Sequence, residues 1–287
     1  MNLKNVAIML LPGLYTYETR IKPEGLKALL FHNMGYLITV SPLLAESLIR
    51  FTVDGTLHYM FMILSKLIIG FVTLYLIYEI WYVVNDFVSV KREFAPTHRG
   101  RGISLNVYVF IVVRFTMFIV IVLLFHLLLL SQQVEYLSPK DFSFLYIVCG
   151  IFAVGLLHNF NRNNLTRNVS HATMRILRFS YPAVYVDGLG TLPACIIALL
   201  PLTILDEISY IVYQLNKVYY KEVGKTITLP RAPLLLHYLA VLPLQIMALS
   251  AINMPWYILG NVLLVLASLI KLLHKRIAKV QECFIDQ

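Results

Sequence analysis

Residues 59–84 read Y-M-F-M-I-L-S-K-L-I-I-G-F-V-T-L-Y-L-I-Y-E-I-W-Y-V-V, and this stretch decides the fold class of the chain. Its only charged residues are Lys66 and Glu79. A helix needs about 20 predominantly apolar residues to cross the hydrocarbon core of a bilayer. The stretch therefore predicts a transmembrane helix.

The whole chain is also rich in hydrophobic residues and poor in charged ones. Of its 287 residues, 59% are hydrophobic and 14% are charged, whereas a soluble domain carries about 25% charged residues. A water-soluble fold of this size could not bury so much apolar surface. The composition therefore predicts an integral membrane protein, with residues 1–287 forming a single helical domain.

Further apolar stretches predict further membrane spans. The clear ones are 31–50, 105–130, 142–160, 233–251 and 255–274. Residues 180–216 are also apolar, but Pro193, Pro201 and the pair Asp206–Glu207 interrupt them, so they could form two short spans or one long and one broken span. We expect an all-α, polytopic transmembrane bundle of about eight spans (eight or nine).

The basic residues predict the orientation of this bundle. They gather in five groups, within 4–27, 91–101, 162–178, 217–231 and 271–279, and are almost absent from the alternate loops. Eight spans with both termini in the cytoplasm place all five groups inside, as the positive-inside rule requires. We therefore assign the net charge of +9 to lipid head groups and topology, and we expect no nucleic-acid partner.

The N-terminal stretch Val6–Leu14 is apolar and follows Lys4, as in a signal peptide. The apolar run is short, however, and Pro12 and Gly13 interrupt it before any A-x-A cleavage pattern. We therefore expect an interfacial or re-entrant segment.

A polar segment follows the span at 59–84 and reads N85-D-F-V-S-V-K-R-E93. If the helix continues, Asn85, Ser89 and Glu93 recur every four residues on one face, with Asp86 beside them. Such side chains at the cytoplasmic mouth of a bundle should face its interior. Their oxygens suit Mg²⁺, although a helix end that meets a polar loop is the simpler alternative.

This segment resembles the first aspartate-rich motif, NDxxDxxxD, of the UbiA superfamily of intramembrane prenyltransferases. The next residues, P96-T-H-R-G-R-G-I-S104, are similar to the RPxxSGxIS run that often follows in that family. In the predicted cytoplasmic loop before residue 233, N216-K-V-Y-Y-K-E-V-G-K-T-I-T-L-P230 is similar to the end of the second motif, with Gly224 and Thr228-Leu-Pro in place. The resemblance covers most of the chain by topology, but only about 35 residues by motif.

The chain departs from the family at acidic positions. Ser89 replaces the central aspartate of the first motif, and Glu93 keeps the charge of the last one. Asn216 and Tyr220 stand where the second motif is expected to have aspartates. Because the family uses these acids to hold two Mg²⁺ ions against a prenyl diphosphate, the resemblance here implies one ion, with lysines and arginines balancing part of the diphosphate charge.

The resemblance implies Mg²⁺-assisted transfer of a polyprenyl group from a lipid diphosphate to a small or membrane-soluble acceptor. It implies Asn85, Asp86 and Glu93 as catalytic residues and metal ligands. The residues expected to contact the substrate are Ser89, Lys91, Arg92, Arg99, Arg101, Asn216, Lys217, Tyr220 and Lys221. Terpene cyclisation, sugar-phosphate transfer to a polyprenyl phosphate, a catalytically inactive relative and a small transporter remain alternatives.

Two charged residues lie within the predicted spans. Arg114 must face the bundle interior or extend to the interface. A carboxylate at the depth of Glu79 is costly unless it is paired or protonated. Because both lie in the cytoplasmic half, we predict that they form an ion pair.

Two further expectations concern polar and aromatic residues. We expect the cluster Asn159–Asn164 to join the fourth and fifth spans in a cytoplasmic loop. Together with Arg162, Arg167, Arg175 and Arg178 of that loop, it could cap the cavity, or the loop could be solvated and face lipid. We assign most tyrosines near the span ends, among them Tyr36, Tyr82 and Tyr181, to an aromatic interface belt. Tyrosines inside the bundle could instead shield a cation through its attraction to the ring face.

Overall fold

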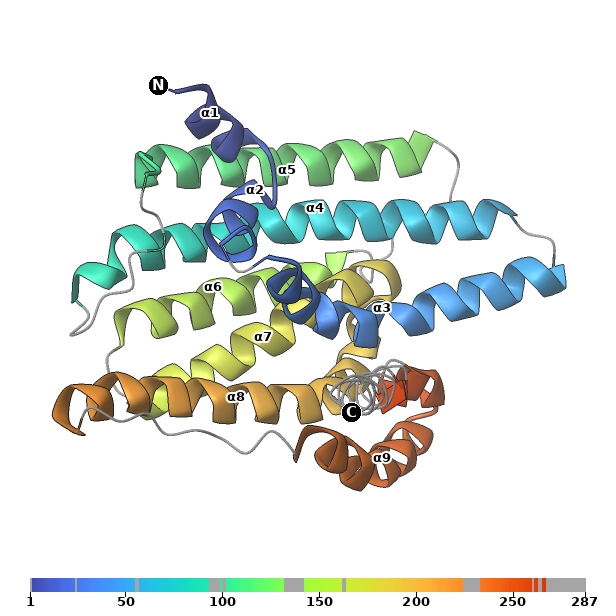
Figure 1. Ribbon diagram of the computed structural model, residues 1–287. Coiled ribbons are helices and arrows are strands. Elements are labelled where there is room, and N and C mark those ends of the chain that lie inside the picture. Colours follow the sequence, from blue (N-terminus) through green and yellow to red (C-terminus); the bar gives the residue numbers. More distant parts are fainter. Residues whose placement is uncertain are drawn as a thin grey trace, which may run out of the picture.

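The computed structural model describes residues 2–23, 25–54, 57–92, 99, 102–131, 142–161, 164–223, 233–259, 261–262 and 265–266. All regular elements in these ranges are helical, which confirms the predicted all-α class (Figure 1). The long helices are α3 (Leu26–Asp54), α4 (Leu57–Phe87), α5 (Val107–Ser131), α6 (Phe144–Phe160), α7 (Asn164–Asp187), α8 (Leu192–Val223) and α9 (Pro233–Ala251). The short ones are α1 (Leu3–Leu10), α2 (Leu14–Thr16), the π-helix η1 (Tyr17–Ile21) and the 3₁₀ turns η2 (Ser89–Arg92), η4 (Leu189–Thr191) and η5 (Pro255–Ile258).

Three helical segments are long and apolar enough to cross a membrane. They are Asn33–Val53, Tyr59–Lys91 and Val107–Leu128, and shorter apolar helices cover Phe144–Phe160, Leu189–Leu205 and Val241–Ala251. The total of about eight spans and the cytoplasmic termini stay predictions. Most of the predicted span at 255–274 lies outside the described residues.

The outer surface of the bundle is apolar. On α5, Leu123, Leu124 and Leu127 expose 56%, 55% and 59% of their surface. A monomeric soluble protein rarely exposes a large contiguous apolar patch, whereas lipid tails solvate leucine well. This surface agrees with a membrane protein.

Helix α7 is the central helix of the bundle and contacts α3, α4, α6 and α8 (Figure 1). Met174, Arg178, Tyr181 and Tyr185 recur on one of its faces and are all buried. This spacing of three to four residues is the period of a helix face. The polar side chains of this face are therefore enclosed by the neighbouring helices.

Two sequence expectations fail at this helix. Residues 164–178 belong to α7 and not to a cytoplasmic loop, because their arginines and asparagines lower the hydropathy without breaking the helical period. The stretch 180–216 divides at Gly188, which has a positive φ of 85°. Helix α8 then continues through Pro201 as far as Val223.

Glycine permits two close helix crossings. A Cβ atom at Gly35 of α3 would overlap the ring of Phe179 of α7, and one at Gly155 of α6 would overlap the indole of Trp81 of α4. Small residues at such points let helices in membranes approach closely. The positions of α6 and α7 against α3 and α4 therefore depend on these two glycines.

We expect Gly155→Ala to lower the free energy of unfolding by about 1–3 kcal/mol, because the added methyl group overpacks the site against Trp81. The midpoint of thermal unfolding in detergent micelles measures the effect. Gly190→Ala is the matched control, since no atom lies within 4 Å of its added Cβ. Equal midpoints for the two variants would contradict the close crossing.

Candidate functional site

The N-terminal segment (residues 2–23) folds onto the bundle as a broken helix. Helix α1 ends at Leu10, and the chain turns at Pro12 and Gly13 before α2 and η1. Gly13 has a φ of 84°, a conformation that glycine adopts without strain. Helix α1 contacts α5, and α2 contacts α4 (Figure 1), so a segment whose helices are each too short to span the bilayer still reaches two long helices.

Glu79 of α4 is fully buried and binds this turn. Its Oε2 accepts a hydrogen bond from the Gly13 N–H at 3.1 Å, and its Oε1 accepts one from the Thr16 N–H at 2.7 Å. Arg114 of α5 forms an ion pair with Oε2 at 2.8 Å. The predicted pairing of Glu79 with Arg114 is therefore confirmed, and the pair also binds backbone groups of the N-terminal segment.

Arg114 contacts the same segment directly. Its Nη2 lies 2.8 Å from the carbonyl oxygen of Ile8 and 2.9 Å from that of Leu11. These carbonyl groups lie at the end of α1, where intrahelical partners run out. The guanidinium group thus donates hydrogen bonds to the carbonyl groups at the end of α1 inside the apolar bundle. It does not extend to the membrane interface.

Asp86, the aspartate of the segment that resembles the first motif, is bound by two side chains of the N-terminal segment. The Tyr15 hydroxyl donates to its Oδ2 at 2.8 Å. Nη2 of Arg20 lies 3.0 Å from Oδ2 and 3.1 Å from Oδ1. The side chains of Asp86 and Arg20 are only 1% and 9% exposed, so little water competes for this ion pair.

Burial and the nearby Asp86 carboxylate both raise the pKa of Tyr15, so its hydroxyl keeps the proton that it donates. Burial by itself would lower the pKa of Arg20, but the Asp86 carboxylate has the opposite effect, and the net pKa is raised. Arg20 is therefore a buried permanent cation beside the motif aspartate.

Arg178 of α7 lies in the same region as Arg20, and the two arginines share one tyrosine ring. The guanidinium carbon of Arg20 lies 3.7 Å from the ring centroid of Tyr82, while Nη1 of Arg178 donates to the Tyr82 hydroxyl at 3.1 Å. Nε of Arg178 donates to the Tyr36 hydroxyl at 2.8 Å, and its guanidinium carbon lies 5.1 Å from the Tyr78 ring. We call Tyr15, Arg20, Tyr36, Tyr78, Tyr82, Asp86 and Arg178 the arginine–tyrosine cluster.

The interface-belt interpretation is wrong for two of the tyrosines it included. Tyr36 is 5% exposed and Tyr181 is 1% exposed, because both belong to helix faces that pack inside the bundle. Sequence reasoning also missed Tyr15 and Arg20 as site residues. Proximity in the sequence could not reveal them, because each lies more than sixty residues before Asp86.

The predicted stripe of Asn85, Ser89 and Glu93 does not continue along one helix face. Helix α4 ends at Phe87, and Ser89 begins the 3₁₀ turn η2, which has a different angular period. The Ser89 hydroxyl donates to Oδ1 of Asn159 in α6 at 3.3 Å. Asn85 remains beside the aspartate, and its Nδ2 donates to Oδ1 of Asp86 at 3.4 Å.

The other predicted site residues divide into two groups. Lys91 and Arg99 are exposed. Glu93 and Arg101 lie outside the described residues, as do the side chains of Arg92, Asn216, Lys217, Tyr220 and Lys221. The backbone of residues 216–223 belongs to α8, so the first half of the second motif-like run is helical and not part of a loop.

The oxygen atoms near Asp86 do not form an open cage for Mg²⁺ in the described part of the chain. Both carboxylate oxygens face Arg20, and Asn85 directs its amide nitrogen toward them. No group of three or more His, Cys, Asp and Glu side chains that could hold a metal ion occurs among the residues that the structure describes. The predicted ligand set with Glu93 stays a prediction.

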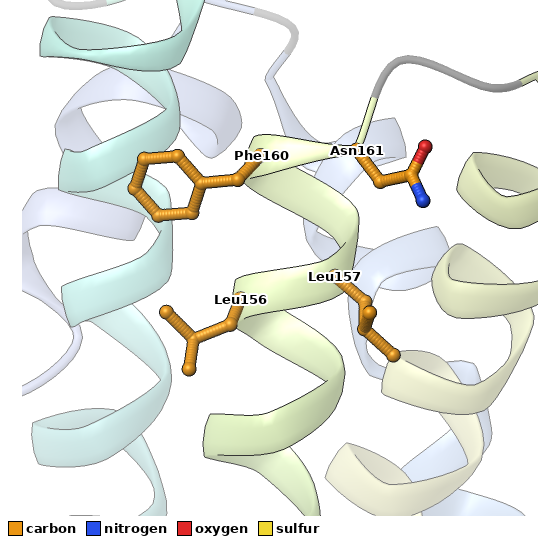
Figure 2. Close-up of a pocket in the computed structure, with 4 residues that line it drawn as sticks. All are labelled: Leu156, Leu157, Phe160 and Asn161. Atoms are coloured by element: carbon orange, nitrogen blue, oxygen red, sulfur yellow. The ribbon is translucent and has the colours of Figure 1, made fainter.

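A separate surface hollow of about 670 Å³ lies at the end of α6. Leu156, Leu157, Phe160 and Asn161 line it, and Figure 2 shows Leu156 and Phe160 on the same side of the helix. Leu156 and Leu157 are each 51% exposed. The hollow therefore belongs to the apolar outer surface and not to the arginine–tyrosine cluster.

Comparison with known proteins gives no match to this chain: no family model, no curated protein and no solved structure matches it. The resemblance to the UbiA superfamily accordingly rests on the two short segments of sequence quoted above.

Changing Arg114 to Gln should lower the free energy of unfolding by about 3–5 kcal/mol, because the carboxylate of Glu79 then stays buried without its cation. Adding Glu79→Gln should restore part of this loss, since no uncompensated charge remains. A double-mutant cycle in reversible detergent unfolding measures the coupling. The exposed pair of Glu46 with Arg50 is the control, and Glu46→Gln should cost less than about 1 kcal/mol.

Proposed function

We propose that this protein is a UbiA-like intramembrane transferase, which moves a polyprenyl group from a lipid diphosphate to a small or membrane-soluble acceptor. One observation carries the proposal: Asp86 of the motif-like segment is buried in the helical bundle and pairs with Arg20, which lies over the ring of Tyr82, and the Tyr82 hydroxyl accepts a hydrogen bond from Arg178. Buried guanidinium groups inside an apolar bundle suit a substrate with a phosphate head and a hydrocarbon tail.

The proposed reaction needs cations at the leaving group. The allylic C–O bond to the diphosphate breaks, and its electron pair leaves with the diphosphate. Cationic groups stabilise the charge that develops there. A guanidinium group binds two phosphate oxygens through parallel hydrogen bonds, and Arg20 and Arg178 are the buried arginines of the cluster. The acceptor then bonds to the allylic carbon and loses a proton.

The tyrosines suit the carbon end of the same reaction. Tyr78 and Tyr82 lie edge to face with their ring centroids 5.0 Å apart, and Tyr36 is in the same cluster. A ring face attracts a positive charge, so these rings can shield an allylic carbon that becomes carbocation-like. The surrounding apolar helices exclude water, which would otherwise hydrolyse the substrate.

The test is turnover of radiolabelled geranylgeranyl diphosphate by the full chain in lipid vesicles, with a membrane-lipid extract as the source of acceptor. We expect release of inorganic diphosphate together with label in a new lipid-soluble product. Arg178→Gln should lower the rate by about 100-fold, as the loss of one preorganised donor to a developing anion does in other enzymes. Arg50→Gln, which changes an exposed arginine, should leave the rate unchanged.

The products also separate the alternatives. A cyclic hydrocarbon formed without acceptor would indicate terpene cyclisation, and a sugar phosphate joined to the lipid would indicate the other transfer reaction. Binding without release of diphosphate would contradict transfer and indicate an inactive relative.

A further inference from the structure

We propose that the hollow at the end of α6 binds one anionic phospholipid, with an acyl chain in the hollow and the phosphate group beside Asn161 and Arg167. The site lies on the outer surface of the bundle and is separate from the arginine–tyrosine cluster. It goes beyond the proposed function and does not depend on it.

The hollow has the size and the lining that suit a lipid chain. Its volume of about 670 Å³ falls in the range of small-molecule sites, about 300–1,000 Å³. Leu156, Leu157 and Phe160 are apolar and exposed, so they offer the chain an accessible surface. Asn161, the fourth lining residue, lies beyond them at the end of α6 (Figure 2). The hollow is therefore apolar along the helix and polar at one end, as a phospholipid is.

The residues that follow α6 place the hollow near the lipid head groups. Helix α6 is apolar and ends at Phe160, and residues 161–164 read N-R-N-N. Polar and charged side chains such as these are costly in the hydrocarbon core of a bilayer. The end of α6 therefore lies at the boundary of the hydrocarbon core, which is the depth at which a phospholipid has its phosphate.

The charge around this end of α6 favours an anionic head group. The sequence has no aspartate or glutamate from residue 142 to residue 186, whereas Arg162 follows α6 and Arg167 belongs to the first turn of α7. The Ser170 hydroxyl joins this turn to α6, because it lies 3.0 Å from the Arg167 carbonyl oxygen and 3.1 Å from Nδ1 of His158. A basic residue near the bilayer surface attracts anionic lipids.

One carboxylate from another helix reaches this region. Glu207 of α8 lies 2.5 Å from Nδ1 of His171 in α7. The histidine therefore faces this carboxylate, and Arg162 and Arg167 give the region its positive charge.

The apolar face of α5 provides a contrast within the same molecule. It exposes Leu123, Leu124 and Leu127, but the only Asp, Glu, Lys or Arg of α5 is Arg114, which is buried. Lipid tails can solvate such a face without any preference for a head group. The end of α6 differs because an apolar hollow and basic residues occur there together.

The test measures quenching of Trp81 fluorescence by phospholipids with brominated acyl chains, in vesicles that contain the full chain. Trp81 is a local reporter, because its indole packs against Gly155 of α6, the residue before Leu156. Trp256→Phe removes the other tryptophan of the chain. At equal mole fractions, we expect brominated phosphatidylglycerol to bind about fivefold more tightly than brominated phosphatidylcholine, the effect of one basic residue near the bilayer surface.

Variants at both ends of the hollow locate the site. Arg167→Gln and Asn161→Asp should each lower the preference for phosphatidylglycerol about fivefold, because the first removes a positive charge and the second adds a negative one. Arg167→Lys, which preserves the charge, should retain the preference. Phe160→Ser should weaken phosphatidylglycerol binding by about threefold or more, since it removes apolar lining. Arg50→Gln and Leu127→Ser change exposed residues elsewhere and are the controls.

Equal binding of the two lipids would overturn the site, because lipid would then only solvate the hollow. A preference that neither Arg167→Gln nor Asn161→Asp lowers would place the anionic lipid elsewhere and would also overturn it. A preference that Phe160→Ser leaves unchanged would indicate attraction of head groups without a chain in the hollow, which contradicts the proposal as well. Thermal midpoints identify any variant that fails to fold, and each of these outcomes leaves the proposed transferase function standing.

Discussion

The buried ion pair between Glu79 and Arg114 is the interaction on which the rest of the site depends. Neither side chain has any exposed surface, and an unpaired charge at this depth would cost several kcal/mol. The pair also binds the backbone of Gly13 and Thr16 and the carbonyl groups at the end of α1. Backbone groups buried in an apolar bundle need hydrogen-bond partners, so the pair and the N-terminal segment stabilise each other.

The periodicity of α4 extends this anchor to the candidate site. Glu79 and Asp86 are seven residues apart, which is close to two helical turns, so both lie on the same face of α4. A short segment fixed at Glu79 can therefore reach Asp86, and it does so through Tyr15 and Arg20. The position of Arg20 thus follows from the Glu79–Arg114 ion pair, which anchors the segment about two helical turns away along α4. The arginine–tyrosine cluster combines this anchored segment with side chains of α3, α4 and α7.

Sequence reasoning predicted the features that leave a local signal. Long apolar runs predicted the helices at 31–50 and 105–130, and similar depth in the bundle predicted the pairing of Glu79 with Arg114. It failed for α7, because a polar inner face and a polar loop have the same composition and differ only in their period. It also failed for Arg20, whose partner is distant in the chain, and for Tyr36, since a buried tyrosine and a tyrosine of the interface belt look alike in sequence.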